Sequence, residues 1–228
     1  MTLVNNNLEK LAVDEISTLA EFVVTENFKH HSNNNLPINY KNDIISISEE
    51  EVKSFNNSDI FVVKDSLGKI SGSIRVLKWN YQDELPIEKI FGINPIDITG
   101  HSPLKHIWHI GRFAIKKESK DITLFKRLMV CAIAPICTHE NSVAFAECDS
   151  KLLRVLLALG IKATVIGEPI DYLGSETIPV CLPYEGLIDF YNKNKHLVSE
   201  NMVNHSKKAG SLPKGVVFNN QHYNYPLV

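Results

Sequence analysis

Residues 106–116 read His106-Ile-Trp-His-Ile-Gly-Arg-Phe-Ala-Ile-Lys116, and this stretch decides the fold of the chain. Its aromatic and β-branched residues predict a buried strand. Gly111 inside the run indicates a β-bulge or a close approach of another backbone. On a regular strand His109 and Arg112 would point to opposite faces, so a bulge at Gly111 would bring both side chains to one face.

The residues after this strand alternate between helical and strand patterns. Helical spacing predicts three helices, over 121–137, 150–159 and 183–196, and short apolar runs predict three strands, over 142–149, 161–167 and 177–182. Asp121 or Ser119 is suited to cap the first helix, and Gly160 is suited to end the second. This half of the chain therefore has a βαβ order.

The residues before the strand predict an antiparallel hairpin. The segments 59–65 and 69–79 are rich in β-branched residues, and Asp65–Gly68 between them is a turn sequence with its glycine late. The Pro- and Gly-containing segment 80–103 predicts a long loop, and a long loop inside a compact domain is more often functional than idle.

Helices are expected at the N-terminus. Helical spacing predicts a helix over 8–28, and an Asn-rich loop over 27–42 follows it. Ser48 and Glu51 form a capping box that predicts the start of a second helix. The element order indicates an α/β (α+β) fold with a mixed, mostly antiparallel central sheet flanked by helices. We expect one domain over 1–198 and a polar C-terminal tail over 199–228.

Composition excludes several classes of protein. The 228 residues include 24 Lys and Arg against 26 Asp and Glu, and 44% are hydrophobic, which is typical of a globular chain. The near-neutral charge argues against nucleic-acid binding. No apolar run approaches the ~18 residues of a membrane span, and no signal peptide is visible. Four cysteines without a CxxC pair indicate a reducing, cytoplasmic setting and no metal site.

Common catalytic signatures are absent from the sequence. It contains no GxGxxG, no GxxxxGK[ST], no GxSxG and no HExxH motif. Hydride transfer, nucleotide hydrolysis and serine hydrolysis therefore lack their usual motifs.

Three stretches resemble the GNAT acyltransferases. Gly72–Val76 (GSIRV) resembles their G-x-x-R strand, Trp108–Ile115 resembles their central W-E-x-x-R-F-x-V strand, and the helix ending in Leu159-Gly160-Ile161 resembles their late L-G-F helix. The resemblance spans roughly residues 55–185. Within that superfamily the sequence is most similar to the acyl-homoserine-lactone (autoinducer) synthases and N-acyl amino acid synthases.

The resemblance implies transfer of an acyl group from an acyl-CoA or an acyl carrier protein to a small amine such as an amino acid. The two arginines of the motif map onto Arg75 and Arg112, and the central glutamate maps onto His109, which is a departure. The N-terminal Arg and Trp of the autoinducer enzymes have no counterpart beside Phe28, so homoserine lactone synthesis is not expected and a different amine is the expected acceptor.

The expected donor site follows the central strand, over Ile115, Lys116, Lys117, Lys120 and Thr123. GNAT acetyltransferases carry a Gly-rich loop there whose N–H groups hold the CoA diphosphate, and this chain has no glycine there. The departure favours the phosphopantetheine arm of a carrier protein. A cluster of cations suits docking of an acidic carrier, although a solvated start of a helix explains it equally well. The cluster comprises Lys116, Lys117, Lys120, Lys126 and Arg127.

The chemistry suggests roles for the remaining residues. N–H groups of Gly111–Phe113 are candidates to stabilise the oxyanion, and His109 or Glu147 is a candidate base. Arg75 or Arg112 is suited to bind an acceptor carboxylate. The predicted catalytic residues are therefore His109, Arg112, Phe113 and Glu147, and the predicted substrate-binding residues are Arg75, Trp108, Ala144 and Ala146, of which the two alanines leave space for an acyl chain.

Each role has a structural alternative. His109 is equally suited to the core, Arg112 to a buried ion pair, Arg75 to the surface and Glu147 to pairing with an arginine. Ala144 and Ala146 also suit close packing of a helix on the sheet. Leu156 replaces the tyrosine that usually protonates the thiolate, so two other functions stay open: an acetyl-CoA-dependent N-acetyltransferase and a catalytically degenerate GNAT-fold binding protein. The sequence leaves the oligomeric state open.

Overall fold

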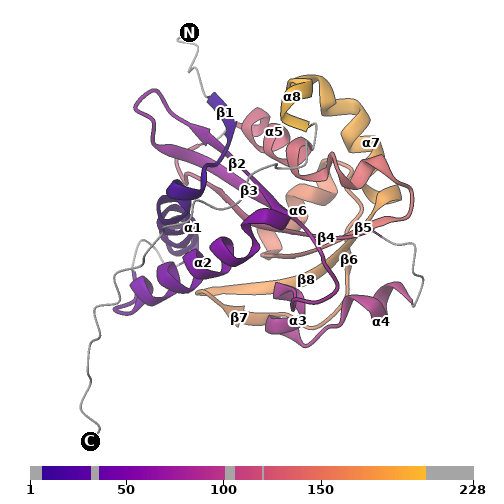
Figure 1. Ribbon diagram of the computed structural model, residues 1–228, viewed down its shortest axis with the longest axis horizontal. Coiled ribbons are helices and arrows are strands. Elements are labelled where there is room, and N and C mark those ends of the chain that lie inside the picture. The colour runs from indigo at the N-terminus through magenta and orange to yellow at the C-terminus, as the bar shows by residue number, and fades with distance from the viewer. Residues whose placement is uncertain (1–6, 32–35, 101–105, 120, 204–228) are drawn as a thin grey trace, which may run out of the picture.

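A central sheet of eight strands forms the middle of the molecule in the computed structural model (Figure 1), which describes residues 7–31, 36–100, 106–119 and 121–203. The strands are β1 (Asn7–Lys10), β2 (Ser58–Lys64), β3 (Ile70–Lys78), β4 (His106–Ile115), β5 (Ser142–Cys148), β6 (Thr164–Val165), β7 (Ile170–Tyr172) and β8 (Ser175–Pro183). Their order is β1-β2-β3-β4-β5-β8-β6, and β7 pairs with β8. Strands β4 and β5 are parallel and the other described pairs are antiparallel, which confirms the predicted fold class.

Helices cover both faces of this sheet. They are α1 (Ile16–His31), α2 (Tyr40–Ser54), α3 (Pro86–Phe91), α4 (Pro95–Thr99), α5 (Ile122–Ile133), α6 (Ser150–Ala158), α7 (Tyr184–Asn194) and α8 (Glu200–Val203), with short 3₁₀ helices at Val13–Glu15, Phe55–Asn57, Ile136–Thr138 and Lys195–Leu197. No helix in the described ranges is long and apolar enough to cross a membrane.

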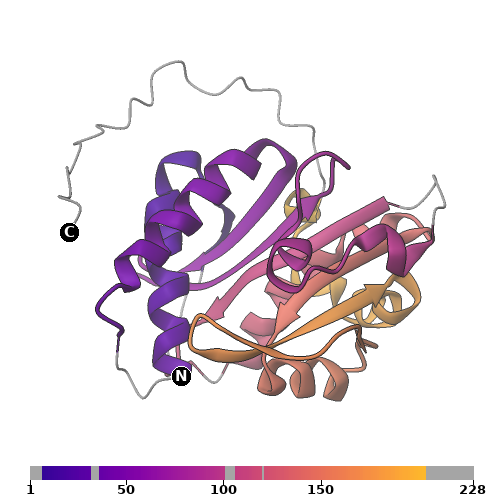
Figure 2. The same ribbon diagram turned by 90° about the horizontal axis from the view of Figure 1, so that it is seen from below.

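Two layers of core hold the helices to the sheet. The larger core joins α5, α6 and α7 to the sheet face that carries Ile74, Ile110 and Ala146. On the opposite face α1 packs over β2, and α2 packs beside α1 (Figure 2). Because side chains alternate along a strand, the neighbours Arg75, His109 and Glu147 point to the α1 and α2 side. These three ionisable side chains therefore lie together on the sheet face opposite the larger core.

A bulge and a divergence of strands open the sheet at its centre. Ser73 pairs with Ala114 and Arg75 pairs with Gly111, so β4 carries one extra residue between these pairs. Arg112 lies at this bulge, and its backbone has a left-handed φ of 53°. The β4–β5 pairing ends at Ile110, and beyond it the two strands separate. The structure confirms the predicted bulge beside Gly111.

The predicted start positions of the first two helices are wrong. Residues 7–10 form an edge strand on β2, so the first helix begins at Ile16. The second helix begins at Tyr40, far before Ser48. The Ser48 hydroxyl donates to the carbonyl of Ile44 inside the helix, so it does not cap an end.

Two further predictions, one of a loop and one of a strand, are incomplete. The segment 80–103 holds α3 and α4, and each begins with proline and ends before glycine, as helices commonly do. The predicted strand over 161–167 shortens to β6. The predicted strand over 177–182 is confirmed as part of β8, and the strand β7 that pairs with it was not predicted. Asp121 caps α5 and Gly160 follows α6 with a φ of 85°, as expected. Helix α8 lies inside the predicted tail, and 204–228 lie outside the described residues.

Candidate functional site

A cleft of about 540 Å³ lies where β4 and β5 separate. Its walls come from α1, from the bulged half of β4, from the first turns of α5 and α6, and from the β7–β8 hairpin. The cleft is continuous from the sheet face under α1 to the face under α5, because the missing strand pairing leaves the layer open there. A substrate that spans both faces of the sheet can therefore be accommodated.

A buried ion-pair network borders the cleft. Glu51 is fully buried, and its Oε1 accepts hydrogen bonds from Arg75 NH1 and Arg112 Nε, both at 2.6 Å. Arg112 also donates to Glu50 Oε2 at 2.7 Å, and Glu50 pairs with Lys89. Removal of one partner from such a buried pair typically costs about 3–5 kcal/mol. The two arginines of the motif are thus held by the neighbouring carboxylates of α2.

His109 links this network to Glu147. Its Nδ1 lies 2.8 Å from Arg75 NH2, and its Nε2 lies 2.9 Å from Glu147 Oε2. An arginine only donates hydrogen bonds, so Nδ1 must be the acceptor and the ring proton sits on Nε2, where it is donated to Glu147. Burial lowers the pKa of His109, and the charge of Arg75 lowers it further against the opposing effect of Glu147. His109 is therefore a neutral imidazole with both nitrogens occupied.

Glu147 is the carboxylate that this arrangement presents to the cleft. Its side chain is 12% exposed and lines the cleft, whereas His109 is almost fully buried. The hydrogen bond from His109 Nε2 fixes the orientation of the carboxylate without neutralising it. Of the two predicted bases, Glu147 has the geometry to exchange a proton with a ligand.

The bulge brings the predicted residues of β3, β4 and β5 onto one network. Arg75, His109, Arg112 and Glu147 all lie within it, so Arg75 is not a surface residue. The Ser73 hydroxyl donates to the Arg112 carbonyl at 2.8 Å and supports the left-handed residue. Phe113 lines the cleft and meets Phe125 edge to face at 5.3 Å.

The predicted acyl-site residues lie elsewhere. Trp108, Ala144 and Ala146 belong to the core under α5 and are absent from the cleft walls. Ala144 pairs with Trp108, and Ala146 pairs with Ile110. Their positions match the alternative of close packing of helices on the sheet. The apolar part of the cleft is instead formed by Phe113, Phe125, Ile122, Leu152 and Val155.

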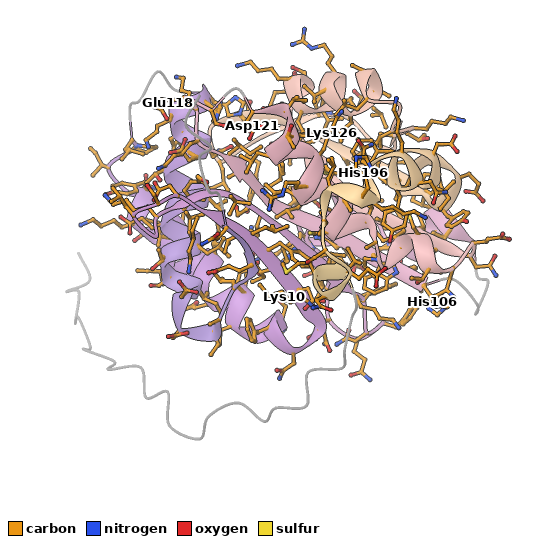
Figure 3. All side chains as sticks on the ribbon, turned by 90° about the horizontal axis from the view of Figure 1, so that it is seen from above. Lys10, His106, Glu118, Asp121, Lys126 and His196 are labelled. Atoms are coloured by element: carbon orange, nitrogen blue, oxygen red, sulfur yellow. The ribbon has the colours of Figure 1, made fainter. Side chains whose placement is uncertain are left out.

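Only some of the predicted donor-site residues line the cleft. Ile115 and Lys116 line the cleft, and Lys116 pairs with Asp65 at 3.0 Å. The Lys117 ammonium donates to the Lys29 carbonyl, and the Thr123 N–H donates to Asp121 at 2.8 Å. Lys120 lies outside the described residues. The predicted docking cluster is mixed in sign, because Glu118 and Asp121 belong to the same segment of the chain as its lysines, and Figure 3 shows Glu118, Asp121 and Lys126 in the upper part of that view.

Cys148 lies in the cleft wall without the properties of a nucleophile. Burial raises the pKa of its thiol to about 12, and Asp149 and Glu147 add to this effect. None of the four cysteines, all of which lie in the described ranges, forms a disulfide. Across the described ranges, His, Cys, Asp and Glu side chains form no group of three suited to a metal ion.

Sequence reasoning missed Glu50, Glu51 and Tyr172. Glu51 shares a helix face with the apolar residues Ile44 and Ile47, and this spacing is a signal that could have identified it as buried. Tyr172, at the end of β7, lines the cleft, and burial raises the pKa of its phenol. Arg112, Glu50, Lys89 and Glu147 are the charged groups that act on it.

Comparison with known proteins identifies the fold. No family profile and no curated protein matches the sequence. FeeM, an N-acyl amino acid synthase from uncultured soil microbes, matches with a TM-score of 0.54 at 15% identity, over 80% of this chain and 92% of its own. The AHL synthase LasI matches with a TM-score of 0.50 at 13% identity, over 83% and 96%. A GNAT-family acetyltransferase from Staphylococcus aureus matches with a TM-score of 0.51 at 11% identity, over 78% and 99%. The chain therefore has the GNAT fold.

Proposed function

We propose that this chain is an N-acyltransferase that moves an acyl group from the thioester of a carrier protein or of CoA to the amine of a small acceptor such as an amino acid. The observation that carries the proposal is the carboxylate of Glu147, which a neutral His109 orients into a cleft between diverging strands. The GNAT fold of acyltransferases supports it.

Glu147 is the proposed base. It accepts a proton from the acceptor amine, and the freed lone pair attacks the thioester carbonyl. His109 is a positioning residue, since its Nδ1 is engaged by Arg75 and its Nε2 by Glu147. Burial lowers the pKa of His109, and the charge of Arg75 lowers it further, so the ring stays neutral.

The collapse of the tetrahedral intermediate completes the reaction. The C–N bond has formed, the C–S bond breaks with its electron pair on sulfur, and the thiolate takes up a proton to leave as a thiol. The nitrogen releases its remaining extra proton to water, which leaves a neutral amide. Leu156 stands where related enzymes carry a tyrosine, and Tyr172 is the phenol that the cleft offers instead. Its raised pKa keeps it protonated until the thiolate forms. The backbone N–H groups of the bulge at Gly111–Phe113 are the proposed donors to the oxyanion.

Arg112 is the proposed anchor for an acceptor carboxylate. Its side chain is 11% exposed and faces the cleft, whereas Arg75 is almost fully buried. Arg112 pairs with Glu50 through one amino group, and an acceptor carboxylate can replace Glu50 there. An amino acid suits this arrangement, because its amine and carboxylate are close together and Arg112 and Glu147 line the same cleft.

The test is formation of an acyl amide, followed by mass spectrometry. The chain is incubated with acyl carrier protein thioesters or acyl-CoA and a panel of amino acids and other amines. Glu147→Gln should lower the rate by about 10²–10⁴-fold, as expected for loss of a general base. Glu168→Gln, at an exposed position outside the cleft, is the matched control.

The other functions have distinct outcomes in the same assay. Product from acetyl-CoA alone would replace the proposal with an acetyl-CoA-dependent N-acetyltransferase. No acyl amide from any donor and acceptor pair would overturn the enzyme and leave a GNAT-fold binding protein. Full activity in Glu147→Gln would remove Glu147 from the mechanism.

A further inference from the structure

The turn of the β7–β8 hairpin has a conformation that its first residue does not favour. Tyr172 pairs with Ser175, so Leu173 and Gly174 form a two-residue turn. Both have a positive φ, 48° at Leu173 and 78° at Gly174, which is the pattern of a type I′ turn. Asparagine or glycine is common at the first of these positions, whereas leucine rarely adopts a positive φ. The turn alone therefore does not account for a leucine here.

Contacts with two N-terminal helices do account for it. The Leu173 side chain is partly buried and packs against the apolar cluster of α1 and α2 that contains Val24, Phe28 and Ile47. The Leu173 carbonyl accepts a hydrogen bond from Asn27 Nδ2 of α1 at 2.5 Å. Figure 1 and Figure 2 show the hairpin extending from the sheet to these helices. Leu173 and Asn27 thus form a clamp between the turn and the helices.

This clamp joins two walls of the cleft. Asn27 lines the cleft from α1, and Tyr172, Ser175 and Thr177 line it from the hairpin. The hydrogen bond between Asn27 and Leu173 therefore connects α1 to the hairpin across the same cleft. Tyr172 immediately precedes the clamped turn in the sequence, so the position of its phenol depends on the clamp.

We propose that Leu173 is a positioning residue that clamps the β7–β8 hairpin to α1 and α2 and thereby holds the phenol of Tyr172 in the cleft wall. This inference rests on the proposed function, in which Tyr172 gives its proton to the departing thiolate. The proton passes from the phenol oxygen to sulfur, and the phenolate then regains a proton from water. The left-handed backbone at Leu173 is unfavourable for a leucine, and strain of this kind is common near functional sites.

The variant Leu173→Asn separates the clamp from the turn. It gives the sequence Asn-Gly, which strongly favours a type I′ turn, and it removes the apolar contact. Leu173→Met keeps a flexible apolar side chain for the same cluster. Ile44→Ala is the matched control, because Ile44 packs on that cluster from α2 and does not line the cleft. Urea denaturation verifies that each variant is folded.

The first measurement follows the phenol of Tyr172 directly and needs no substrate. Burial raises the pKa of Tyr172 in the folded protein. The difference between the absorbance titrations of each protein and of its Tyr172→Phe counterpart isolates this phenol from the other tyrosines. In Leu173→Asn the pKa should fall toward the ordinary value of about 10. Leu173→Met and Ile44→Ala should titrate as the wild type does.

The second measurement is a double-mutant cycle on acyl transfer. Leu173→Asn should lower kcat by at least about tenfold with little change in the KM for the thioester, because a positioned general acid contributes about 10²–10⁴-fold. In the Tyr172→Phe background the same substitution should lower kcat by less than about twofold, since the two residues act on one step. Ile44→Ala should keep the wild-type kcat.

Three results would overturn the inference. The first is an unchanged pKa of Tyr172 in Leu173→Asn, and the second is an equal fall of that pKa in Ile44→Ala. The third is a loss of kcat in the Tyr172→Phe background as large as in the wild type, which would show that Leu173 acts on another part of the cleft. A lowered pKa in Leu173→Asn together with full activity of Tyr172→Phe would keep the clamp and overturn only the role of Tyr172 as the acid.

Discussion

Two buried glutamates flank the cleft, and the chain compensates their charges in different ways. Glu51 of α2 is bound by two arginines inside the protein. Glu26 of α1 is bound by one backbone N–H and by Lys29, whose side chain is 41% exposed. Arginine stays charged at any pH at which the chain folds. Glu51 is therefore neutralised by groups of the interior, whereas the binding of Glu26 depends in part on a lysine that reaches the solvent.

The largest expected effect that tests this difference is the loss of stability in Glu51→Gln. The substitution keeps the size of the side chain and leaves Arg75 and Arg112 beside each other without their shared carboxylate. The free energy of unfolding should fall by about 3–5 kcal/mol, because an uncompensated buried charge remains. Urea denaturation of both proteins measures the difference.

Glu49→Gln is the matched control for this prediction. Glu49 is an exposed neighbour in the same helix, so its replacement should change stability by no more than about 0.5 kcal/mol. A loss in Glu51→Gln as small as that of the control would show that the two arginines do not depend on Glu51. The distinction between the two glutamates would then disappear.

The next effect concerns the pH dependence of stability through His109. Burial lowers the pKa of His109 in the folded protein, so the unfolded chain binds the proton more readily as pH falls below about 6.5. The stability that the neutral ring contributes is complete above that pH and is lost as pH falls toward the lower folded pKa. His109→Gln keeps an acceptor for Arg75 and a donor for Glu147, and it removes the titration.

The difference between wild type and His109→Gln isolates this contribution. His31 and His106 also have lowered pKa values, but they are present in both proteins and their effects cancel. Denaturation at a series of pH values from about 8 to 5 should show a steeper loss of stability in the wild type. Parallel curves would mean that burial in the folded protein does not lower the pKa of His109.

The fold was predictable from sequence where local residues determine it. The β-branched runs, the turn at Asp65–Gly68 and the glycine at 111 specify strands, a hairpin and a bulge from only a few neighbouring residues. The capping box of Ser48 and Glu51 predicted the wrong start for α2, because distant residues and not neighbouring ones determine the role of Glu51. The role of Glu51 is set by Arg75 and Arg112, which lie 24 and 61 residues further along the chain. No local pattern contains those partners.

The candidate site was predictable in part for the same reason. Arg75, His109, Arg112 and Glu147 lie on adjacent strands, and the strand pairing brings them together once the bulge is recognised. The partners Glu50, Glu26 and Tyr172 come from helices and a hairpin whose approach depends on tertiary packing. Ala144 and Ala146 were assigned to an acyl site because small residues leave space, but α5 and its neighbours fill the space on their side of the sheet.

The smallest expected effect comes from Lys29→Met, and it sharpens the comparison from the side of Glu26. An ion pair with a partly exposed lysine contributes little, and the last turn of α1 also loses a favourable charge, so stability should fall by about 0.5–1 kcal/mol. Urea denaturation measures the effect. A loss as large as that of Glu51→Gln would show that Lys29 neutralises Glu26 as fully as the arginines neutralise Glu51.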